Sequence, residues 1–238
     1  MAGSPLRVFD LAQPLFDGCP AMPGTPRVRL RAVRTVDRDG YALETLRVTT
    51  HSGTHVDAPG HLLHGERGAI SDFRPDHFIG PCLLADLTAK EDDDEITAED
   101  LEAYRGRLEP GDILVLATGW SRFRGEDEDR WRNHSPYLTA EGAEWLCARG
   151  LKGVGIDHYT IGTSLERFDR PPHEILLRRR IWIAEDLVVP PELLGEPRKW
   201  LYVGVPLNIE GASGAPVRPV LLDVEAGPAP GEAPGPQT

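Results

Sequence analysis

Short apolar stretches separated by polar turns mark the first half of the 238-residue chain. Residues 28–36 and 42–49 alternate in polarity or carry β-branched side chains, and Asp37-Arg38-Asp39-Gly40 between them is typical of a turn. Residues 79–87 and 112–117 form short, mostly apolar runs of the kind found in buried strands. The pattern therefore predicts a β-rich first portion.

Helical signals appear in the second half and alternate there with short strands. Thr97, with Asp100 three residues later, is typical of a helix N-terminus, and Gly150 is typical of a helix end. The predicted helices cover residues 97–104, 139–149 and 172–180, and the predicted strands cover 153–156, 181–184 and, as the last of the series, 201–205. This mixture indicates an α/β or mixed domain.

Length and composition favour one folded domain with a short tail. A chain of 238 residues can build one sizeable core, and 40% hydrophobic with 27% charged residues is usual for a soluble globular protein. The last residues are rich in Pro, Gly and Ala, which cannot form a core. We therefore expect a single domain over residues 1–225 and a disordered tail over 226–238.

Charge and cysteine content restrict the location and the partners. A net charge of -12 makes the chain a poor binder of nucleic acid and of anionic membranes. The three cysteines are far apart and odd in number, so they suggest no disulfide framework. Residues 1–11 lack the pattern of a signal peptide. We expect a soluble cytoplasmic protein whose partner is a small molecule.

Two charged runs have ordinary explanations, and one tryptophan allows two interpretations. The acidic run Glu91 to Glu95 is best interpreted as a solvated loop, because five adjacent carboxylates repel one another. Arg178-Arg179-Arg180 fits the solvated C-terminal end of a helix. Trp120 could line a pocket for an aromatic substrate or pack in the core, and the sequence leaves both open.

Candidate chemistry is concentrated in one short segment. Four of the eight histidines fall within fourteen residues, at His51, His55, His61 and His64. Together with Asp57, the first two offer two imidazoles and a carboxylate, a ligand set that suits Zn²⁺, Mn²⁺ or Fe²⁺. A single histidine is usually a surface or core residue, but four in one Gly/Pro-rich loop are hard to explain by packing. His64 fits an exposed loop, and we leave it out of the site.

The spacing suggests a geometry for this segment. Positions four apart meet on one face of a helical turn, so we expect His51 and His55 to converge. Gly53 allows the backbone to turn closely beneath an ion, and Pro59 stiffens the exit from the loop. We expect His61, beyond this bend, to face the metal without binding it.

These residues also carry a resemblance to a known family. The motif His51-x-Gly53-Thr54-His55-x-Asp57-x-Pro59-x-His61 resembles the signature of the cyclase family, which includes bacterial kynurenine formamidases (arylformamidases) and isatin hydrolases. The resemblance extends over residues 9–222. Thr25 and Thr160-Ile161-Gly162 depart from the usual family pattern, and the second departure weakens an assignment of the formamidase substrate.

The family's second pair of metal ligands is a histidine and a glutamate twelve residues apart. His173 and Glu185 have this spacing here. Glu174 or Asp186 could equally supply the acid, and the sequence alone does not separate them. The resemblance therefore implies one ion held by His51, His55 and Asp57, with Asp57 bridging to a second ion held by His173 and Glu185.

The resemblance also implies the fold and the reaction. The fold would be a cyclase-like swivelling β/β/α domain, a mixed sheet with flanking helices. One or two divalent ions, Zn²⁺ or Mn²⁺, would activate a water for attack on an amide, lactam or lactone, with His61 as the catalytic proton shuttle. Family members are commonly homodimers or homotetramers. Two alternatives stay open: a biosynthetic cyclase or dehydratase with the same metal site, and a metal-binding protein without activity.

Overall fold

The computed structural model describes residues 6–63, 68–163, 170–196 and 198–224. The predicted tail over 226–238 and His64 lie outside these residues. Within the described part of the chain, no helix is long and apolar enough to cross a membrane.

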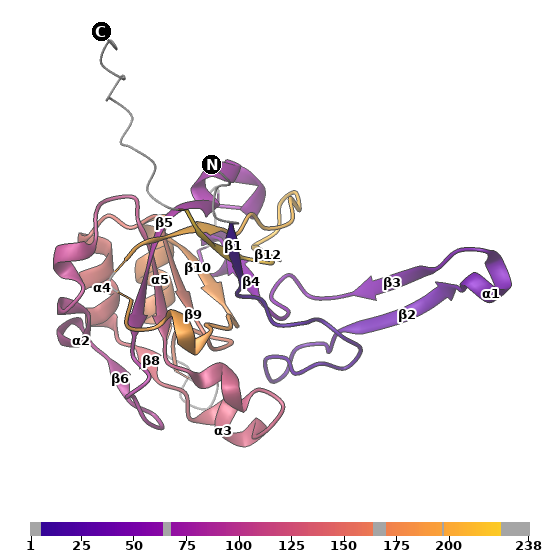
Figure 1. Cartoon of the computed structure of the whole chain (residues 1–238), viewed down its shortest axis with the longest axis horizontal. Helices are drawn as coiled ribbons and strands as arrows, with labels where there is room; N and C mark the ends of the chain where they lie inside the picture. Colours follow the sequence, from indigo (N-terminus) through magenta and orange to yellow (C-terminus); the bar gives the residue numbers. More distant parts are fainter. Residues whose placement is uncertain (1–5, 64–67, 164–169, 197, 225–238) are drawn as a thin grey trace, which may run out of the picture.

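A nine-stranded mixed sheet forms the centre of the molecule (Figure 1). In spatial order its strands are β1 (Arg7–Asp10), β13 (Val220–Asp223), β11 (Trp200–Val203), β5 (Ile79–Asp86), β7 (Ile113–Ala117), β9 (Gly153–Ile156), β10 (Trp182–Glu185), β4 (His55–Asp57) and β12 (Gly214–Pro216). The four strands β5, β7, β9 and β10 run parallel, and the other neighbours are antiparallel. The sheet therefore joins segments from both ends of the sequence.

Both faces of the sheet are buried at its central strands, as the continuous apolar run of β7 predicts. Leu114 and Leu116 pack against residues of α2 (Ala98–Glu102), α4 (Ala140–Ala148) and α5 (Pro171–Arg178), which cover one face (Figure 1). Ile113 and Val115 belong to the core on the opposite face, which is rich in aromatic residues. Alternate side chains of one strand thus stabilise two layers.

The helix termini follow the sequence closely. The Thr97 hydroxyl accepts a hydrogen bond from the Asp100 N–H, and the Asp100 carboxylate accepts one from the Thr97 N–H, which confirms the predicted capping box. The Thr139 hydroxyl accepts from the Gly142 N–H at the start of α4. The prediction that residues 201–205 end the series is wrong, because β12 and β13 follow.

Several short elements were not predicted. Besides β4, β12 and β13, they include α3 (Glu128–Asn133), the parallel pair β6 (Glu95–Ile96) and β8 (Tyr137–Leu138), and the 3-10 helices η1 (Pro59–His61), η2 (Ile70–Asp72), η3 (Pro75–Phe78), η4 (Arg105–Arg107), η5 (Trp120–Phe123) and η7 (Pro191–Leu193). Their shortness explains why no periodic pattern announces them.

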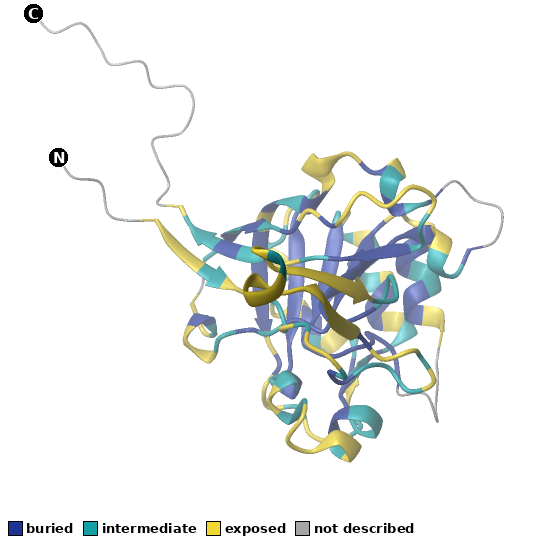
Figure 2. Cartoon of the chain, turned by 90° about the vertical axis from the view of Figure 1, so that its right-hand side faces the viewer, coloured by how far each residue is buried: buried dark blue, intermediate teal, exposed yellow. Residues whose placement is uncertain are grey.

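The two predicted strands near the N-terminus form a separate hairpin. β2 (Arg29–Arg34) and β3 (Leu43–Arg47) pair with each other and not with the main sheet, and the short helix α1 (Val36–Asp39) joins them. Gly40 ends this helix at a φ of 79°, a conformation that favours glycine. The hairpin projects from the body (Figure 1), and both strands are exposed along their length (Figure 2).

The structure also locates Trp120 and the two charged runs noted in the sequence. Trp120 is fully buried in a cluster with Trp131 and Tyr159, so the structure places it in the core. The acidic run from Glu91 is largely exposed, and the three arginines from Arg178 are exposed at the end of α5. The exposure of the two charged runs agrees with the solvated loop and solvated helix end expected from the sequence.

Candidate metal centre

The segment that starts at His51 does not form the helical turn that was predicted. Its first residues make a tight turn, and β4 begins at His55. Because alternate residues of a strand point to the same face, His55 and Asp57 lie side by side. Gly53 reverses the backbone with a φ of 61°, which brings His51 to the same face.

Close packing also restricts the turn. A Cβ on Gly53 would lie 2.5 Å from Leu15 Cδ2, which is too short for an ordinary contact. Glycine is therefore favoured at this position for two independent reasons, its backbone conformation and the absence of a side chain.

The register of the sheet places Glu185 beside His55. β10 runs antiparallel to β4, and the Cα of Glu185 pairs with that of His55. The two side chains meet with 3.5 Å between His55 Nε2 and Glu185 Oε2. His173, on α5, places its Nε2 3.0 Å from Glu185 Oε1.

Glu174 and Asp186, the two alternative acidic partners for His173, form ion pairs with arginines instead. Asp186 has a φ of 55° and forms a buried ion pair with Arg124, with 3.1 Å between Oδ2 and Nε. Glu174 lies 3.5 Å from Arg170 on the outer side of α5. Glu185 is therefore the acid, among these three, that contacts His173.

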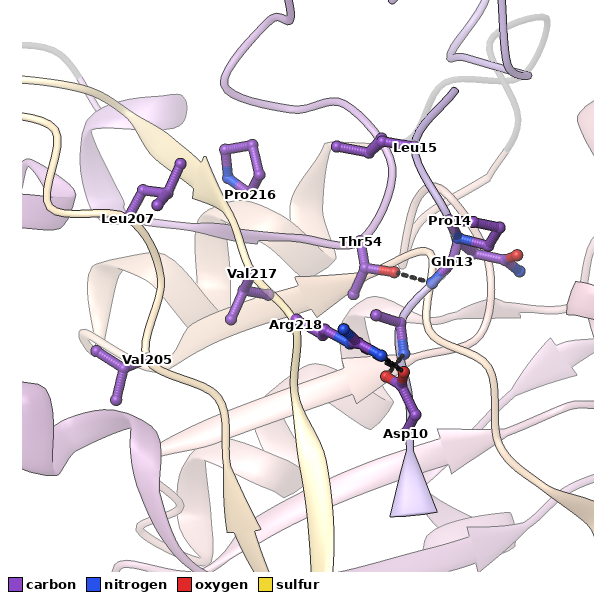
Figure 3. A pocket seen from close by; sticks show the side chains of 11 residues that line it. Asp10, Gln13, Pro14, Leu15, Thr54, Val205, Leu207, Pro216, Val217 and Arg218 are labelled. Atoms are coloured by element: carbon purple, nitrogen blue, oxygen red, sulfur yellow. Dashed lines mark hydrogen bonds and ion pairs between the residues drawn. The ribbon is translucent and has the colours of Figure 1, made fainter. Parts of the chain in front are cut away.

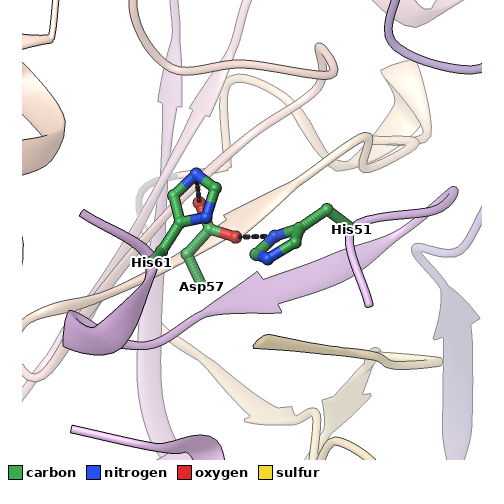
Figure 4. A group of neighbouring side chains, drawn as sticks. All are labelled: His51, Asp57 and His61. Atoms are coloured by element: carbon green, nitrogen blue, oxygen red, sulfur yellow. Dashed lines mark hydrogen bonds and ion pairs between the residues drawn. The ribbon is translucent and has the colours of Figure 1, made fainter. Parts of the chain in front are cut away.

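His61 lies closer to the cluster than the proline bend suggested. It ends η1, and its Nε2 lies 3.9 Å from Asp57 Oδ2. The opposite oxygen, Asp57 Oδ1, is 2.6 Å from His51 Nδ1, and the two imidazole rings lie with their centroids 4.2 Å apart (Figure 4). Asp57 thus has one oxygen near each of the two histidines.

Two groups with the spacing of metal ligands share Asp57. One contains His51, Asp57 and His61, and the other contains His55, Asp57 and Glu185; within each group the ligand atoms lie within 4.8 Å of one another. Five of the six residues singled out in the sequence therefore belong to these two groups, and His173 contacts one of them, Glu185. Asp57 Oδ1 contacts a histidine of each group, at 2.6 Å from His51 Nδ1 and 3.3 Å from His55 Nε2, so the two groups meet at this carboxylate.

The donor set fits a bound cation. The Nδ1–H of His55 can donate to the Gly53 carbonyl at 2.7 Å, which directs Nε2 toward two carboxylates. Asp57 Oδ2 is buried and has no hydrogen-bond partner among the described residues. A buried carboxylate oxygen without a partner is costly, and a metal ion would satisfy it.

The pKa shifts within the cluster also indicate a site for positive charge. Burial opposes protonation of His55, but the Asp57 and Glu185 carboxylates outweigh burial and raise its pKa to about 9. Burial also opposes ionisation of Asp57, yet the surrounding histidines hold its pKa well below the usual range. The site therefore stabilises positive charge at the point where His55 meets the acids.

His61 differs from the other histidines in its electrostatics. Burial, with help from the neighbouring His51 and His173, lowers its pKa despite the opposing charge of Asp57. A histidine with a lowered pKa is neutral at pH 7 and can accept a proton. This property suits a general base.

Outer contacts that the sequence did not reveal hold the ligands in place. The Ser213 hydroxyl lies 2.9 Å from His51 Nε2, and the Ile161 N–H donates to Glu185 Oε1 at 2.8 Å. Neither contact has a local sequence signal, because Ser213 is 162 positions away from His51 and Ile161 is 24 positions away from Glu185. Such contacts fix the orientation of metal ligands.

A cavity of about 160 Å³ opens onto this cluster. Besides the histidines and Glu185, its lining includes Met22, Leu62, Tyr159 and Thr160. Thr160 belongs to the segment that departs from the family pattern. Thr25, the other departure, does not line the cavity, but its hydroxyl donates to the carbonyl of Met22 at 2.6 Å.

Comparisons with known proteins identify the family. A family model described as putative cyclase matches residues 9–162, and the chain belongs to this family. Kynurenine formamidase of Erythrobacter litoralis is 30% identical over 220 residues, which cover 92% of this chain and 94% of that protein. Isatin hydrolase of Roseibium aggregatum is 28% identical over 220 residues, covering 83% of this chain and 82% of the relative.

A solved structure extends the comparison to three dimensions. The predicted metal-dependent hydrolase from Bacillus stearothermophilus matches with a TM-score of 0.73 and 26% identity, covering 93% of this chain and 100% of that chain. The expected fold of the family is thereby confirmed. Fold, family and ligand cluster together define the protein as a metal-dependent hydrolase.

Proposed function

We propose that the protein hydrolyses the C–N bond of an amide or lactam carried by a small aromatic substrate, with lactones as chemically related substrates. The observation that carries this proposal is the buried Asp57 carboxylate shared by two ligand groups. The relatives named kynurenine formamidase and isatin hydrolase support the type of bond. The cavity, with Tyr159 and Met22 in its wall, offers an apolar surface to an aromatic ring.

We further propose that the site holds one or two ions of Zn²⁺ or Mn²⁺. The residues that would hold them are His51, His55, Asp57, His173 and Glu185, a mixture of imidazole and carboxylate ligands that both ions accept. A bound divalent ion supplies a water of lowered pKa and polarises the substrate carbonyl.

The protein's own groups supply positioning and proton transfer. Asp57 and Glu185 provide the negative charge that attracts a cation. The Ser213 hydroxyl orients His51, and the Ile161 N–H orients Glu185. His61 is neutral at pH 7, so its Nε2 can accept the proton of the attacking water and pass it to the leaving nitrogen. We propose that the enzyme works in the cytoplasm; its three cysteines are free thiols.

A substrate screen tests this function. The purified chain is stripped of metal, reloaded with Zn²⁺ or Mn²⁺, and incubated with a formanilide, isatin and a small lactone, and each product is identified by mass. We expect metal-dependent addition of one water to an amide or lactam. Products that lack the added water would favour a cyclase or dehydratase instead, and bound metal without turnover of any substrate would contradict the proposal.

A further inference from the structure

The buried carboxylate of Asp186 has one oxygen without a partner at the wall of the cavity beside the ligand cluster. Only 3% of the residue is exposed, and it lines this cavity together with Glu185 and His55. Among the described residues, Oδ1 of Asp186 finds no hydrogen-bond donor. Asp186 also belongs to neither of the two ligand groups that the described residues form, so an ion held by those groups would not satisfy this oxygen. A buried carboxylate oxygen without a donor is costly, which points to a donor on a bound molecule.

The backbone is shaped to bring this carboxylate to the cavity. Successive side chains of a strand point to opposite faces, so the residue after Glu185 would normally point away from it. Asp186 instead has a φ of 55°, a conformation that is uncommon outside glycine, and lines the same cavity. Its N–H donates to the carbonyl of His158 at 2.6 Å, and its carbonyl accepts from the Thr54 hydroxyl at 2.6 Å. The Thr54 hydroxyl in turn accepts from the Gln13 N–H at 2.8 Å (Figure 3), so contacts from segments distant in the sequence hold the strained residue in place.

Arg124 sets the orientation of the carboxylate. Its Nε lies 3.1 Å from Oδ2 of Asp186, and both side chains are 4% exposed. The guanidinium is itself held, because it donates to the carbonyl of Pro20 at 3.2 Å and lies 5.9 Å from the ring centroid of Trp131. Arg124 does not line the cavity. The ion pair therefore occupies Oδ2 and leaves Oδ1 as the acceptor that is available to a ligand.

An acceptor at this position favours a substrate that carries a donor. A carboxylate oxygen accepts hydrogen bonds, and the N–H of an amide or lactam is a donor that a lactone lacks. Met22 and Leu62 in the same wall offer no acceptor of comparable strength. We propose that Oδ1 of Asp186 accepts a hydrogen bond from an N–H group of the substrate, and that Arg124 is the positioning residue for this contact. This role rests on the proposed function and narrows it, because it makes amides and lactams better substrates than lactones.

The variant Asp186→Asn tests this role in turnover. Asparagine tolerates the same backbone conformation, and its carbonyl oxygen can take the place of Oδ2 beside Arg124. Its NH₂ group then replaces Oδ1, so a donor stands where the wild type has an acceptor. Formanilide and phenyl formate share a shape and differ in N–H against oxygen. We expect the ratio of their kcat/KM values, formanilide over phenyl formate, to fall about 10–100-fold in the variant.

Glu174→Gln is the matched control. It also removes a carboxylate that pairs with an arginine, but Glu174 does not line the cavity, so the variant should keep the wild-type ratio. Because both substrates are measured on the same preparation, a change in metal content or in the amount of folded protein does not alter the ratio.

A binding measurement separates this role from the enzymatic reaction. Indole and benzofuran share a bicyclic shape, differ in N–H against oxygen, and have no bond that hydrolysis can cleave. For the Zn²⁺-loaded wild type we expect calorimetry to show that indole binds at least about tenfold more tightly, and Asp186→Asn should lose this difference. If the variant does not fold, the comparison in the wild type decides alone.

Three results would overturn the role of Asp186. They are indole that binds the wild type no more tightly than benzofuran, an Asp186→Asn variant that keeps the wild-type substrate ratio, and loss of metal from that variant, which would make Asp186 a ligand. A clear preference for indole without turnover of either formyl substrate would contradict the proposed function alone.

Discussion

The turn at Gly53 offers a quantitative test of how the fold holds the metal ligands. Replacement by alanine would force an L-residue into a φ of 61° and place a Cβ 2.5 Å from Leu15 Cδ2. The backbone conformation costs about 1 kcal/mol. The contact costs about 1 kcal/mol more, at the lower end for overpacking, because a leucine side chain can partly move away. We therefore expect Gly53→Ala to lower the free energy of unfolding by about 2 kcal/mol.

Gly18 provides a matched control for this substitution. Its φ is 77°, and an added Cβ would meet nothing within 4 Å, so Gly18→Ala carries the backbone cost alone. In a chain of this size, about 1 kcal/mol lowers the melting temperature by roughly 2–4 °C. We expect a decrease of roughly 2–4 °C for Gly18→Ala and about twice that for Gly53→Ala, measured by calorimetry in the presence of chelator.

Metal binding adds a second measurement to the same pair of variants. Gly53→Ala should also weaken metal binding, because the turn positions His51, whereas Gly18→Ala should leave it unchanged. Equal decreases in melting temperature for the two variants would refute the argument from close packing. An unchanged metal affinity in Gly53→Ala would show that the turn does not determine the position of the ligand.

Three further substitutions address the chemistry of the site. His61→Ala should keep its metal while kcat falls by roughly 10²–10⁴-fold. Because burial lowers the pKa of His61, the wild-type rate should decrease only below pH 6.5, and this acid limb of the pH–rate profile should disappear in the variant. Loss of the metal in the variant would instead make His61 a ligand. Glu185→Gln should reduce the metal content measured by elemental analysis, whereas Glu174→Gln should not, and equal effects would contradict the assignment. Ser213→Ala removes the contact with His51 and should weaken metal affinity by roughly 10–100-fold in a chelator competition; an unchanged affinity would rule out an orienting role.

The strands and helices with strong local signals were predictable from the sequence. The run of β7 is apolar at every position because both of its faces are buried, and Thr97 and Thr139 mark helix starts through hydrogen bonds within four residues. These features depend on neighbouring residues alone. Local pattern is therefore sufficient to identify them.

The residues of the candidate site could be singled out from the sequence, but their backbone conformation could not. Four-residue spacing between His51 and His55 suggested a helical turn, whereas the segment is a turn followed by a three-residue strand. β4 has no apolar run because two of its three residues, His55 and Asp57, are candidate ligands. Its extended conformation comes from hydrogen bonds to β10 and β12, which are distant in the sequence. Ser213 escaped notice for the same reason.

The position of β4 between β10 and β12 has a consequence for the order of events during synthesis. The ribosome releases the segment with His55 and Asp57 long before Glu185 and the residues of β12. Until then β4 lacks both neighbours, and a metal ion could reach only the histidines and the single carboxylate of the early segment. The candidate ligand cluster can therefore be completed only after Glu185 has emerged, and a product that ends before Glu185 cannot contain it.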